Sequence, residues 1–375
     1  MTSKERMLIA MSGGTPDRVP ASPDTNWLIP AKLTGRPFWD VYLHGDPPIW
    51  KAYNDSVKHF GIDGFSHHGV IDIPDLPRVT RRNEIIEKND ERILLRRHFL
   101  CPEGKLYTDI LYPHNQTPAN IKNPIEDMEK QFGCLRYMQG DYEHASFDTY
   151  RLTREDMGEH GVVGLCLSLP TLMLEMRQPN EAMFYDYYDY PELIGKWMQM
   201  QLDKSISLAK QIIDSNLKPD FVFFPMSGLL TLQSEEIVRK YSYPALKTLT
   251  RMFKEAGILT SLHSCGKEYL TVEYAASETD LDCIDPLEVS PMGDCSLSDL
   301  KRKFGKRIAL KGNLHTTEVM LRMKPDGVAK AARQCLDDAM AGGGFILSTG
   351  DQCGRDTPLE NITTLVEVCE KYGKY

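Results

Sequence analysis

The stretch Phe221–His263 reads FVFFPMSGLLTLQSEEIVRKYSYPALKTLTRMFKEAGILTSLH, which is the pattern of a strand, a helix and a second strand. Its two ends are short and almost continuously apolar, as is typical of parallel strands that are covered on both faces. Between them, Ser234 and two glutamates suit the start of a helix that extends to Ala256. The stretch therefore predicts one strand–helix–strand unit of a parallel α/β fold.

The same alternation recurs through the C-terminal half of the chain. Short apolar runs predict further strands at Gly161–Leu169, Cys283–Val289, Ile308–Leu314 and Phe345–Thr349. Helical patterns lie between or after the strands, at Pro191–Asn216, Ser296–Phe304, Lys324–Ala341 and Thr357–Tyr372. Two earlier runs, Val19–Pro23 and Ile62–His67, bring the expected strands to eight. Eight such strands without a glycine-rich nucleotide motif favour a single (β/α)8 barrel of the TIM type over a doubly wound sheet.

Two helix starts carry a capping-box pattern, in which a threonine and a glutamate three residues later bind each other's backbone N–H groups. Thr2 and Glu5 open a short helix at the N-terminus. Thr357 and Glu360 open the last helix, with Pro358 at the first helical position. Both patterns predict where a helix begins.

The segment from about Pro74 to Met157 departs from this alternation. Ile93–Phe99 and Lys105–Leu111 alternate between apolar and polar residues around the turn Cys101–Gly104, which predicts a β-hairpin. Pro113–Pro124 is polar and is expected to be a loop. We therefore expect an excursion over the open end of the barrel, within one domain that covers residues 1–375.

Composition excludes several classes of protein. The net charge of −9 argues against nucleic acid as a partner, because phosphate binding needs a concentrated basic face. No apolar run is long enough to span a membrane, and the first residues lack the apolar core of a signal peptide. Nine scattered cysteines, an odd number, argue against a disulfide framework and predict free thiols in the cytoplasm.

Three residues suggest a metal site. His263 and Cys265 end a predicted strand, and side chains two positions apart on a strand point to the same side. Cys353 follows another predicted strand, so all three are expected at the carboxyl-end rim where barrel enzymes keep their catalytic groups. One imidazole and two thiolates form a soft set that suits zinc and leaves a fourth position open. The alternative is two buried structural cysteines and a rim histidine.

Three further rim residues are candidates for catalysis. Glu288 follows a predicted strand and is placed to accept a proton, to bind substrate or to make a structural hydrogen bond. Asn313 ends a strand, where it would orient the substrate. His315 comes two residues later as a candidate general acid, with a solvent-facing side chain as the alternative.

Candidate substrate-binding residues lie at the ends of the first, second and fourth predicted strands. Asp24, Asn26 and Trp27 come after the first strand, and the Trp27 ring is suited to stacking on an aromatic substrate. His67 ends the second strand. Met226 follows Phe221–Phe224 and is either a soft ligand or a packed core side chain.

Several separate motifs occur in the order found in one known superfamily. They are TPDRVP at Thr15–Pro20, YDYYDYPEL at Tyr185–Leu193, SLHSCG at Ser261–Gly266, DPLE at Asp285–Glu288, KGN at Lys311–Asn313 and the closing segment Gly344–Ile362. Over nearly its whole length the chain resembles the uroporphyrinogen decarboxylase superfamily, and within it the zinc- and corrinoid-dependent methyltransferases.

Two departures help to place the chain within that superfamily. The decarboxylases carry an arginine-rich loop after the first strand, whereas Pro23–Trp27 contains no arginine. His263, Cys265 and Cys353 instead resemble the zinc ligands of the methyltransferase branch. The second departure is from the thiol-methylating members. In them the resemblance implies an acidic residue near the zinc after the strand at Phe221–Phe224, whereas here the sequence reads Pro-Met-Ser.

The resemblance implies a zinc-dependent methyltransferase that moves a methyl group from a methoxylated aromatic to the Co(I) corrinoid of a partner protein. The chain lacks an Asp-x-His-x-x-Gly cobalamin motif, so the corrinoid is expected on another protein. The hairpin and the 375-residue length resemble the substrate-demethylating members. Three alternatives stay open: a methylcorrinoid:thiol methyltransferase of the coenzyme M type, a metal-free decarboxylase, and a non-catalytic protein with a closed structural zinc.

Overall fold

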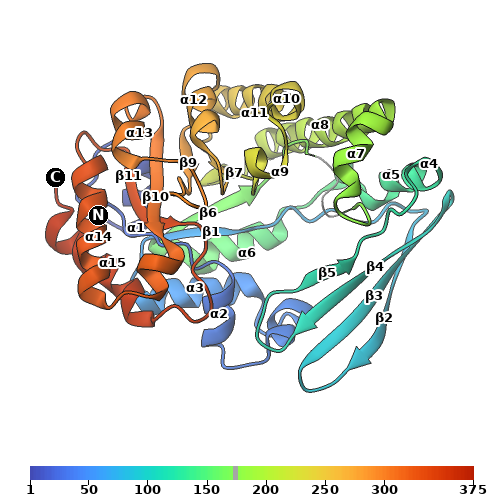
Figure 1. Cartoon of the computed structure of the whole chain (residues 1–375), viewed down its shortest axis with the longest axis horizontal. Helices are drawn as coiled ribbons and strands as arrows, with labels where there is room; N and C mark the ends of the chain where they lie inside the picture. Colours follow the sequence, from blue (N-terminus) through green and yellow to red (C-terminus); the bar gives the residue numbers. More distant parts are fainter. Residues whose placement is uncertain (172–175) are drawn as a thin grey trace.

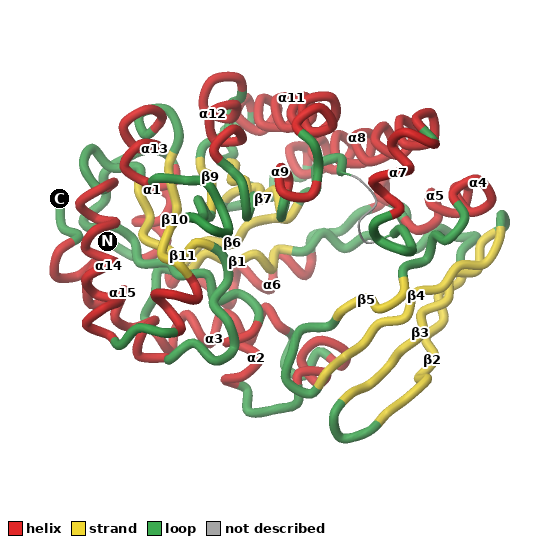
Figure 2. Tube along the Cα trace, in the orientation of Figure 1, coloured by secondary structure: helices red, strands yellow, loops and turns green. Residues whose placement is uncertain are grey.

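The computed structural model describes residues 1–171 and 176–375. Its main element is a parallel sheet of seven strands in the order β1-β6-β7-β8-β9-β10-β11, which curls on itself (Figure 2). The strands are β1 Gly64–Gly69, β6 Gly161–Cys166, β7 Phe221–Pro225, β8 Thr260–His263, β9 Cys283–Asp285, β10 Ala309–His315 and β11 Phe345–Gly350. Each of these strands was predicted, because buried parallel strands are apolar along their whole length.

The one remaining predicted strand, Val19–Pro23, which comes first in the sequence, is wrong: the structure has no strand there. Ala21 forms a single parallel bridge with Leu347 of β11. The Ser22 N–H donates to the Leu347 carbonyl at 2.8 Å, and the Asp63 N–H donates to the Ala21 carbonyl at 2.8 Å. The segment thus lies between β11 and the start of β1, but its flanking prolines have no N–H to extend the ladder. The fold is a curled parallel sheet of seven strands with one bridging segment. The expected parallel α/β architecture is confirmed, whereas a complete eight-stranded barrel is not.

Helices cover the outer face of the curled sheet (Figure 1). The α-helices of the described residues are α1 Ser3–Met11, α2 Leu28–Leu33, α3 Ile49–Phe60, α4 Met128–Gln131, α5 Leu135–Met138, α6 Asp148–Met157, α7 Ala182–Asp189, α8 Pro191–Asp214, α9 Leu229–Leu232, α10 Glu235–Ile237, α11 Tyr243–Glu255, α12 Tyr269–Glu278, α13 Leu297–Phe304, α14 Pro325–Ala339 and α15 Leu359–Tyr372. Among the helices described, none has both the length and the apolar character to cross a membrane.

Of the two predicted capping boxes, one is confirmed. The Thr2 hydroxyl accepts a hydrogen bond from the Glu5 N–H, and the Glu5 carboxylate accepts one from the Thr2 N–H. The box at Thr357 is wrong, because Pro358 is extended at ψ 128° and α15 begins one residue later without a side-chain cap.

Two apolar cores lie on either side of the sheet. Between the sheet and the outer helices, Val222 and Phe224 of β7 share a core with Leu249 and Phe253 of α11. Inside the curl, Phe65, Phe221, Phe223 and Ile346 pack with residues of the N-terminal helix, Met7 and Met11. Because α1 contributes to the inner core, the polar groups of the strands gather at the opposite end.

The predicted excursion contains a four-stranded antiparallel sheet in the order β2-β3-β4-β5, formed by β2 Thr80–Lys88, β3 Arg92–Cys101, β4 Gly104–Pro113 and β5 Ala119–Lys122. The predicted hairpin is confirmed, since Cys101 pairs with Gly104 across a two-residue turn. β2 was not predicted, and the loop expected at Pro113–Pro124 is wrong because it contains β5. β2 is exposed on both faces and therefore lacks apolar alternation.

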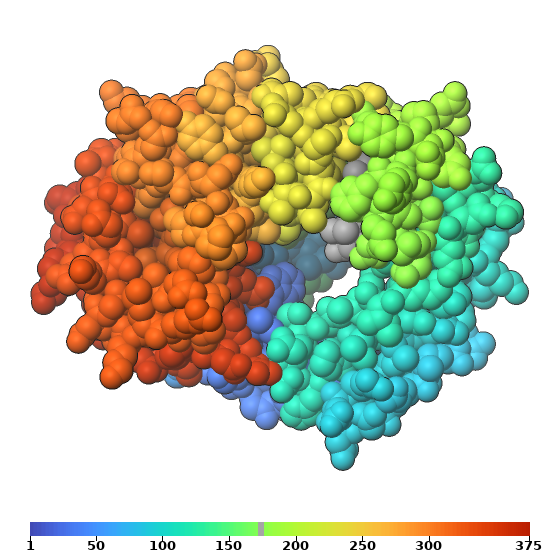
Figure 3. All heavy atoms as spheres, viewed as in Figure 1, coloured from blue at the N-terminus to red at the C-terminus, as the bar shows by residue number. Residues whose placement is uncertain are grey.

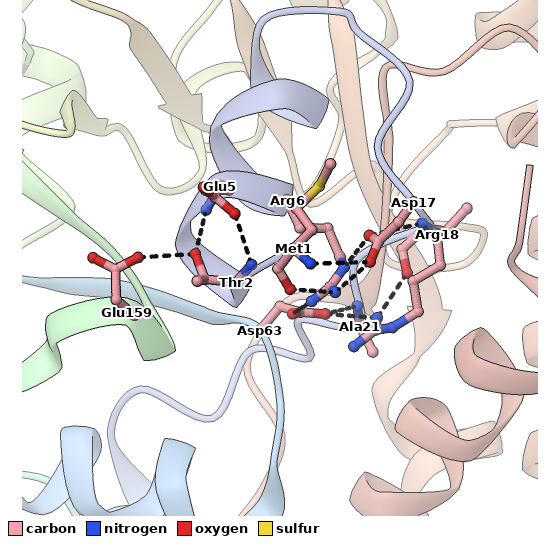
Figure 4. A network of polar contacts seen from close by, with 10 residues as sticks. Met1, Thr2, Glu5, Arg6, Asp17, Arg18, Ala21, Asp63 and Glu159 are labelled. Carbon is pink, nitrogen blue, oxygen red and sulfur yellow. Dashed lines mark hydrogen bonds and ion pairs between the residues drawn. The ribbon is translucent and has the colours of Figure 1, made fainter.

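A buried carboxylate joins the N-terminal helix to the bridging segment (Figure 4). The Asp63 side chain is fully buried and accepts hydrogen bonds from Arg6 Nη1 at 2.6 Å and Arg18 Nη1 at 2.8 Å. It also accepts from the Ala21 N–H at 2.9 Å. Asp63 therefore holds together three segments where the edges of the sheet meet.

Replacing Asp63 by asparagine should destabilise the protein by roughly 3–5 kcal/mol, because two partly buried guanidinium groups lose a shared counter-charge. Urea unfolding followed by circular dichroism measures this. Asp55→Asn is the matched control: its pair with Lys51 is exposed, and its loss should cost only about 0–1 kcal/mol. A loss below 1 kcal/mol for Asp63→Asn would contradict the role assigned to this carboxylate.

Candidate metal centre

Three side chains with metal-binding atoms meet at the carboxyl ends of β8 and β11. The ligand atoms of His263, Cys265 and Asp351 all lie within 4.8 Å of one another, and this is the one such group in the part of the chain that the structure describes. Tetrahedral zinc, with bonds of roughly 2.0–2.3 Å, needs ligand atoms about 3–4 Å apart. The group combines nitrogen, sulfur and oxygen donors, each of which zinc accepts.

Strand pairing positions the first two of these residues. His263 lies opposite Pro225 of β7 and Asp285 of β9 in the parallel register. Beyond the strand, the Ser264 N–H donates to the Asp285 carbonyl at 2.9 Å. Cys265 thus follows directly from a segment that is fixed to the neighbouring strand.

Asp351 follows β11 in an uncommon backbone conformation. Its φ is +91°, which is rare for a residue with a side chain and implies local strain. The Thr349 hydroxyl donates to the Asp351 carbonyl at 2.7 Å, which helps to hold the turn. Strain of this kind is concentrated at functional sites, and here it directs a carboxylate toward His263. Sequence reasoning missed Asp351, although it lies in the same turn as the predicted ligand Cys353.

Cys353 is buried two residues further on and is not a member of the group of three. Its N–H donates to the Asp24 carbonyl at 2.8 Å. Burial raises the pKa of its thiol to about 12. The structure therefore brings together two of the three predicted ligands, and the assignment of Cys353 stays a prediction.

A buried ion pair lies beside His263. Lys311 Nζ is 2.7 Å from Asp285 Oδ2, and both side chains are almost completely buried. Asp285 Oδ1 is 3.7 Å from His263 Nδ1, and Asp351 Oδ1 is 3.8 Å from His263 Nε2. Burial alone would raise the pKa of Asp285, but Lys311 and His263 hold it well below its usual range. The imidazole is thus placed between two carboxylates.

Several buried polar atoms near these residues have no hydrogen-bond partner among the residues that the structure describes. They include His263 Nδ1, Asp285 Oδ1, Ser264 Oγ, Glu268 Oε1 and His67 Nε2. Buried polar atoms are nearly always paired in native proteins, so such a cluster indicates a place for water, substrate or a metal. The donor set and these unpaired atoms fit a zinc ion.

Two glutamates tie the β8 loop to the β9 loop. Glu288 Oε2 accepts from the Gly266 N–H at 2.5 Å, and Glu268 Oε2 accepts from the Leu287 N–H at 2.8 Å. Burial raises the pKa of Glu288 and raises that of Glu268 well above its usual range. Glu288 thus makes the structural hydrogen bond that was one of its three predicted roles, and proton transfer and substrate binding stay predictions. Sequence reasoning missed Glu268, which lies in a polar stretch before α12.

The other two candidate catalytic residues make local contacts. Asn313 Nδ2 donates to the Leu287 carbonyl at 3.0 Å. His315 Nδ1 accepts from the Thr317 and Glu318 N–H groups, both at 3.1 Å, and so caps the turn after β10. Neither residue belongs to the group of three, and their catalytic roles stay predictions.

Three of the predicted substrate-binding residues form a chain of hydrogen bonds. Asp24 Oδ1 accepts from Asn26 Nδ2 at 3.0 Å, and Asn26 Oδ1 accepts from the His67 N–H at 3.0 Å. The His67 ring stacks on Phe223, with centroids 4.3 Å apart, and its centroid lies 6.1 Å from that of His263. Burial lowers the pKa of His67 to about 3, so the imidazole is neutral. His67 therefore presents an uncharged ring beside His263 of the candidate metal centre.

The last two predicted substrate residues, Trp27 and Met226, are not members of the group of three. The Trp27 ring packs edge-on against His68, with centroids 4.6 Å apart. Met226 Sδ accepts from the Leu169 N–H at 3.4 Å, and the residue is buried. Met226 is not in the group of three, and it lines a cavity.

Comparisons with known proteins agree with this architecture. The family model described as uroporphyrinogen decarboxylase (URO-D) matches residues 100–372. The solved structure of a methyltransferase from Methanosarcina mazei superposes with a TM-score of 0.65 and 17% identity, covering 99% of each chain. That likeness shows a shared fold.

Curated relatives match about two thirds of the chain. The methylcobamide:CoM methyltransferase MtbA of Methanosarcina acetivorans is 23% identical over 264 residues, 69% of this chain and 73% of that protein. The protein of the same name from Methanosarcina mazei is 24% identical over 269 residues, 68% and 72% of the two chains. A uroporphyrinogen decarboxylase from Actinobacillus succinogenes is 23% identical over 266 residues, 69% and 70%.

Replacing Lys311 by methionine should destabilise the protein by roughly 3–5 kcal/mol, because the Asp285 carboxylate would stay buried without its counter-charge. Guanidinium unfolding monitored by tryptophan fluorescence measures the change. Lys247→Met removes an exposed pair with Glu278 and should cost about 0–1 kcal/mol. Equal losses for the two variants would show that Lys311 does not compensate Asp285.

Proposed function

The chain belongs to the uroporphyrinogen decarboxylase family, and on that premise we propose that it is a zinc-dependent methyltransferase. In this proposal it passes a methyl group from a methylated small molecule, a methoxylated aromatic, to the Co(I) corrinoid of a partner protein. The observation that carries the proposal is the group of His263, Cys265 and Asp351 at the strand ends. The names of the two Methanosarcina relatives support a corrinoid as the second reactant.

We assign the metal to His263, Cys265 and Asp351, with Cys353 as the alternative third ligand that the sequence predicts. Asp351 is favoured because its carboxylate lies with the other two donors, whereas Cys353 is buried outside the group. When bound, zinc would polarise the heteroatom that carries the methyl group and stabilise the charge left on it. Three protein ligands leave the fourth position for substrate.

The remaining chemistry falls to residues of this chain. As the methyl carbon–oxygen bond breaks, both bonding electrons stay on the oxygen, Co(I) supplies the pair for the new carbon–cobalt bond, and the oxygen takes up a proton. Burial raises the pKa of Glu288, which suits it to hold that proton at its carboxyl group. Asp285 lies 3.7 Å from His263 Nδ1 and orients the imidazole.

The second candidate is methyl transfer from the corrinoid to a thiol, which the names of both Methanosarcina relatives favour. The ligand set favours the first direction. A carboxylate is a harder donor than a thiolate and leaves more positive charge on the metal, which suits polarisation of an ether. A second thiolate in place of Asp351 would favour activation of a bound thiol instead.

Metal analysis tests the ligand set. The wild-type protein should bind about one zinc per chain, and His263→Ala, Cys265→Ser and Asp351→Ala should each weaken the affinity by at least about 10–100-fold. In the cobalt-substituted protein, Cys265→Ser should remove the thiolate charge-transfer band, whereas Cys353→Ser should leave it unchanged. Loss of about half the band in Cys353→Ser would assign Cys353 as the ligand instead.

Methyl transfer tests the reaction and its direction. With zinc, a methoxylated aromatic and cob(I)alamin, the absorbance of Co(I) should give way to that of methylcobalamin. His263→Ala should abolish the reaction, and His144→Ala, an exposed histidine, should leave it unchanged. Transfer from methylcobalamin to coenzyme M, with no reaction from any ether, would decide for the second candidate. A decarboxylation that survives loss of the metal would refute both.

A further inference from the structure

Two cavities lie at the carboxyl ends of β6 and β7, with volumes of about 330 and 560 Å³. In the space-filling view the molecule is hollowed where the yellow, teal and red segments meet (Figure 3). The larger cavity is lined by Leu169 beyond β6, by Pro225 and Met226 at the end of β7, and by Trp197 of α8. Gln139, from the excursion, lines both cavities. Strand ends, a helix and the excursion thus enclose this space together.

One charged residue lines both cavities. Among the described residues that line them, Lys204 of α8 alone carries a charge, and it lines each of the two. Much of the surrounding wall is apolar, with Met138, Met176 and Met183 beside Trp197. Lys204 is therefore the one charged residue in a described lining that is otherwise suited to an apolar body.

Lys204 has no counter-charge within the described parts of the chain. No carboxylate there lies within ion-pair distance of it, and the nearest influence is another cation, Arg81, which is paired with Asp75 at 2.8 Å. Burial, together with Arg81, lowers the pKa of Lys204. The neighbouring Gln201 is already engaged, because its Nε2 donates to the Thr171 carbonyl at 2.8 Å. A half-buried cation without a partner costs stability that a bound anion would restore.

The larger cavity begins one strand away from the candidate metal centre. Pro225 lies opposite His263 in the β7–β8 register, and the Met226 N–H donates to the His263 carbonyl at 2.9 Å. A molecule in this cavity would therefore have one end near the strand that carries His263 and the other near α8.

We propose that the larger cavity, which Lys204 lines, binds the methyl-bearing substrate. This substrate is a small organic acid with one carboxylate or sulfonate on an apolar body, and its anionic group lies at Lys204. This inference rests on the proposed function, since it names the substrate class of the same site. Lys204 supplies a charge-assisted hydrogen bond to the anion, and the methionines and Trp197 contact the apolar body. The cavity volumes are in the range usual for small-molecule sites.

Calorimetric binding to the full-length protein tests the proposal without relying on turnover. Three probes share one body: 4-methoxybenzoate, 4-methoxybenzenesulfonate and neutral methoxybenzene. The wild-type protein should bind at least one of the two anions more tightly than the neutral probe. Lys204→Met should weaken binding of that anion by about 10–100-fold and change the neutral probe less than twofold. Lys204→Arg should recover most of the affinity.

The control is Lys210→Met, an exposed lysine on the same helix, which should bind all three probes as the wild-type protein does. A preference for carboxylate or for sulfonate identifies the head group. Equal weakening of charged and neutral probes in Lys204→Met would overturn the proposal, as would failure of the wild-type protein to bind either anion. If the anion binds through Lys204 while no methyl transfer occurs with any donor, the anion site stands and the proposed function fails.

Discussion

The ion pair between Lys311 and Asp285 is the interaction on which the candidate site depends. Lys311 points into the inside of a curled sheet, with its Nζ 4.7 Å from the centroid of the Phe65 ring, where an isolated ammonium would be strongly disfavoured. Asp285 neutralises it and places its other oxygen 3.7 Å from His263. The charge that makes Lys311 tolerable is therefore also the charge that orients the histidine. Neighbouring strands β8, β9 and β10 are coupled by electrostatics as well as by their backbone ladder.

Much of the fold could be predicted because its strands are buried on both faces. Continuous apolarity at β6 to β11 is a local signal that survives without knowledge of the neighbours. This apolar signal is lost where a strand is only partly buried. β2 is exposed along nearly its whole length, so its residues carry no pattern, and the bridging segment near Ala21 is apolar but interrupted by prolines. The start of α15 was misjudged for a related reason: Pro358 suits the first helical position, yet it can equally well precede the helix.

The site divides in the same way. His263 and Cys265 were expected together from strand alternation. Their ligand atoms do lie within 4.8 Å of each other, although β8 itself ends at His263. In the turn after β11 no periodicity constrains the side chains, and a positive φ at Asp351 decides which of them faces His263. Glu268 and Lys204 could not be predicted from the sequence, for another reason. The role of each residue depends on contacts with segments that are remote in sequence. Glu268 binds the Leu287 N–H, and Lys204 lines a cavity at the ends of β6 and β7.

The two parts of the site would impose different demands on a ligand. The metal-binding group at β8 and β11 would recognise the atom that carries the methyl group, and that chemistry is shared by ethers, amines and thioethers. In our proposal, Lys204 would recognise a charge at the far end of the ligand, in the cavities at the ends of β6 and β7. An analogue without that charge would leave a half-buried cation unpaired. The free energy lost in this way is larger than the free energy gained from one more apolar contact, so it discriminates more strongly between substrates. Reactivity and specificity would thus be assigned to different elements, the ends of β8 and β11 for the metal and α8 for the anion.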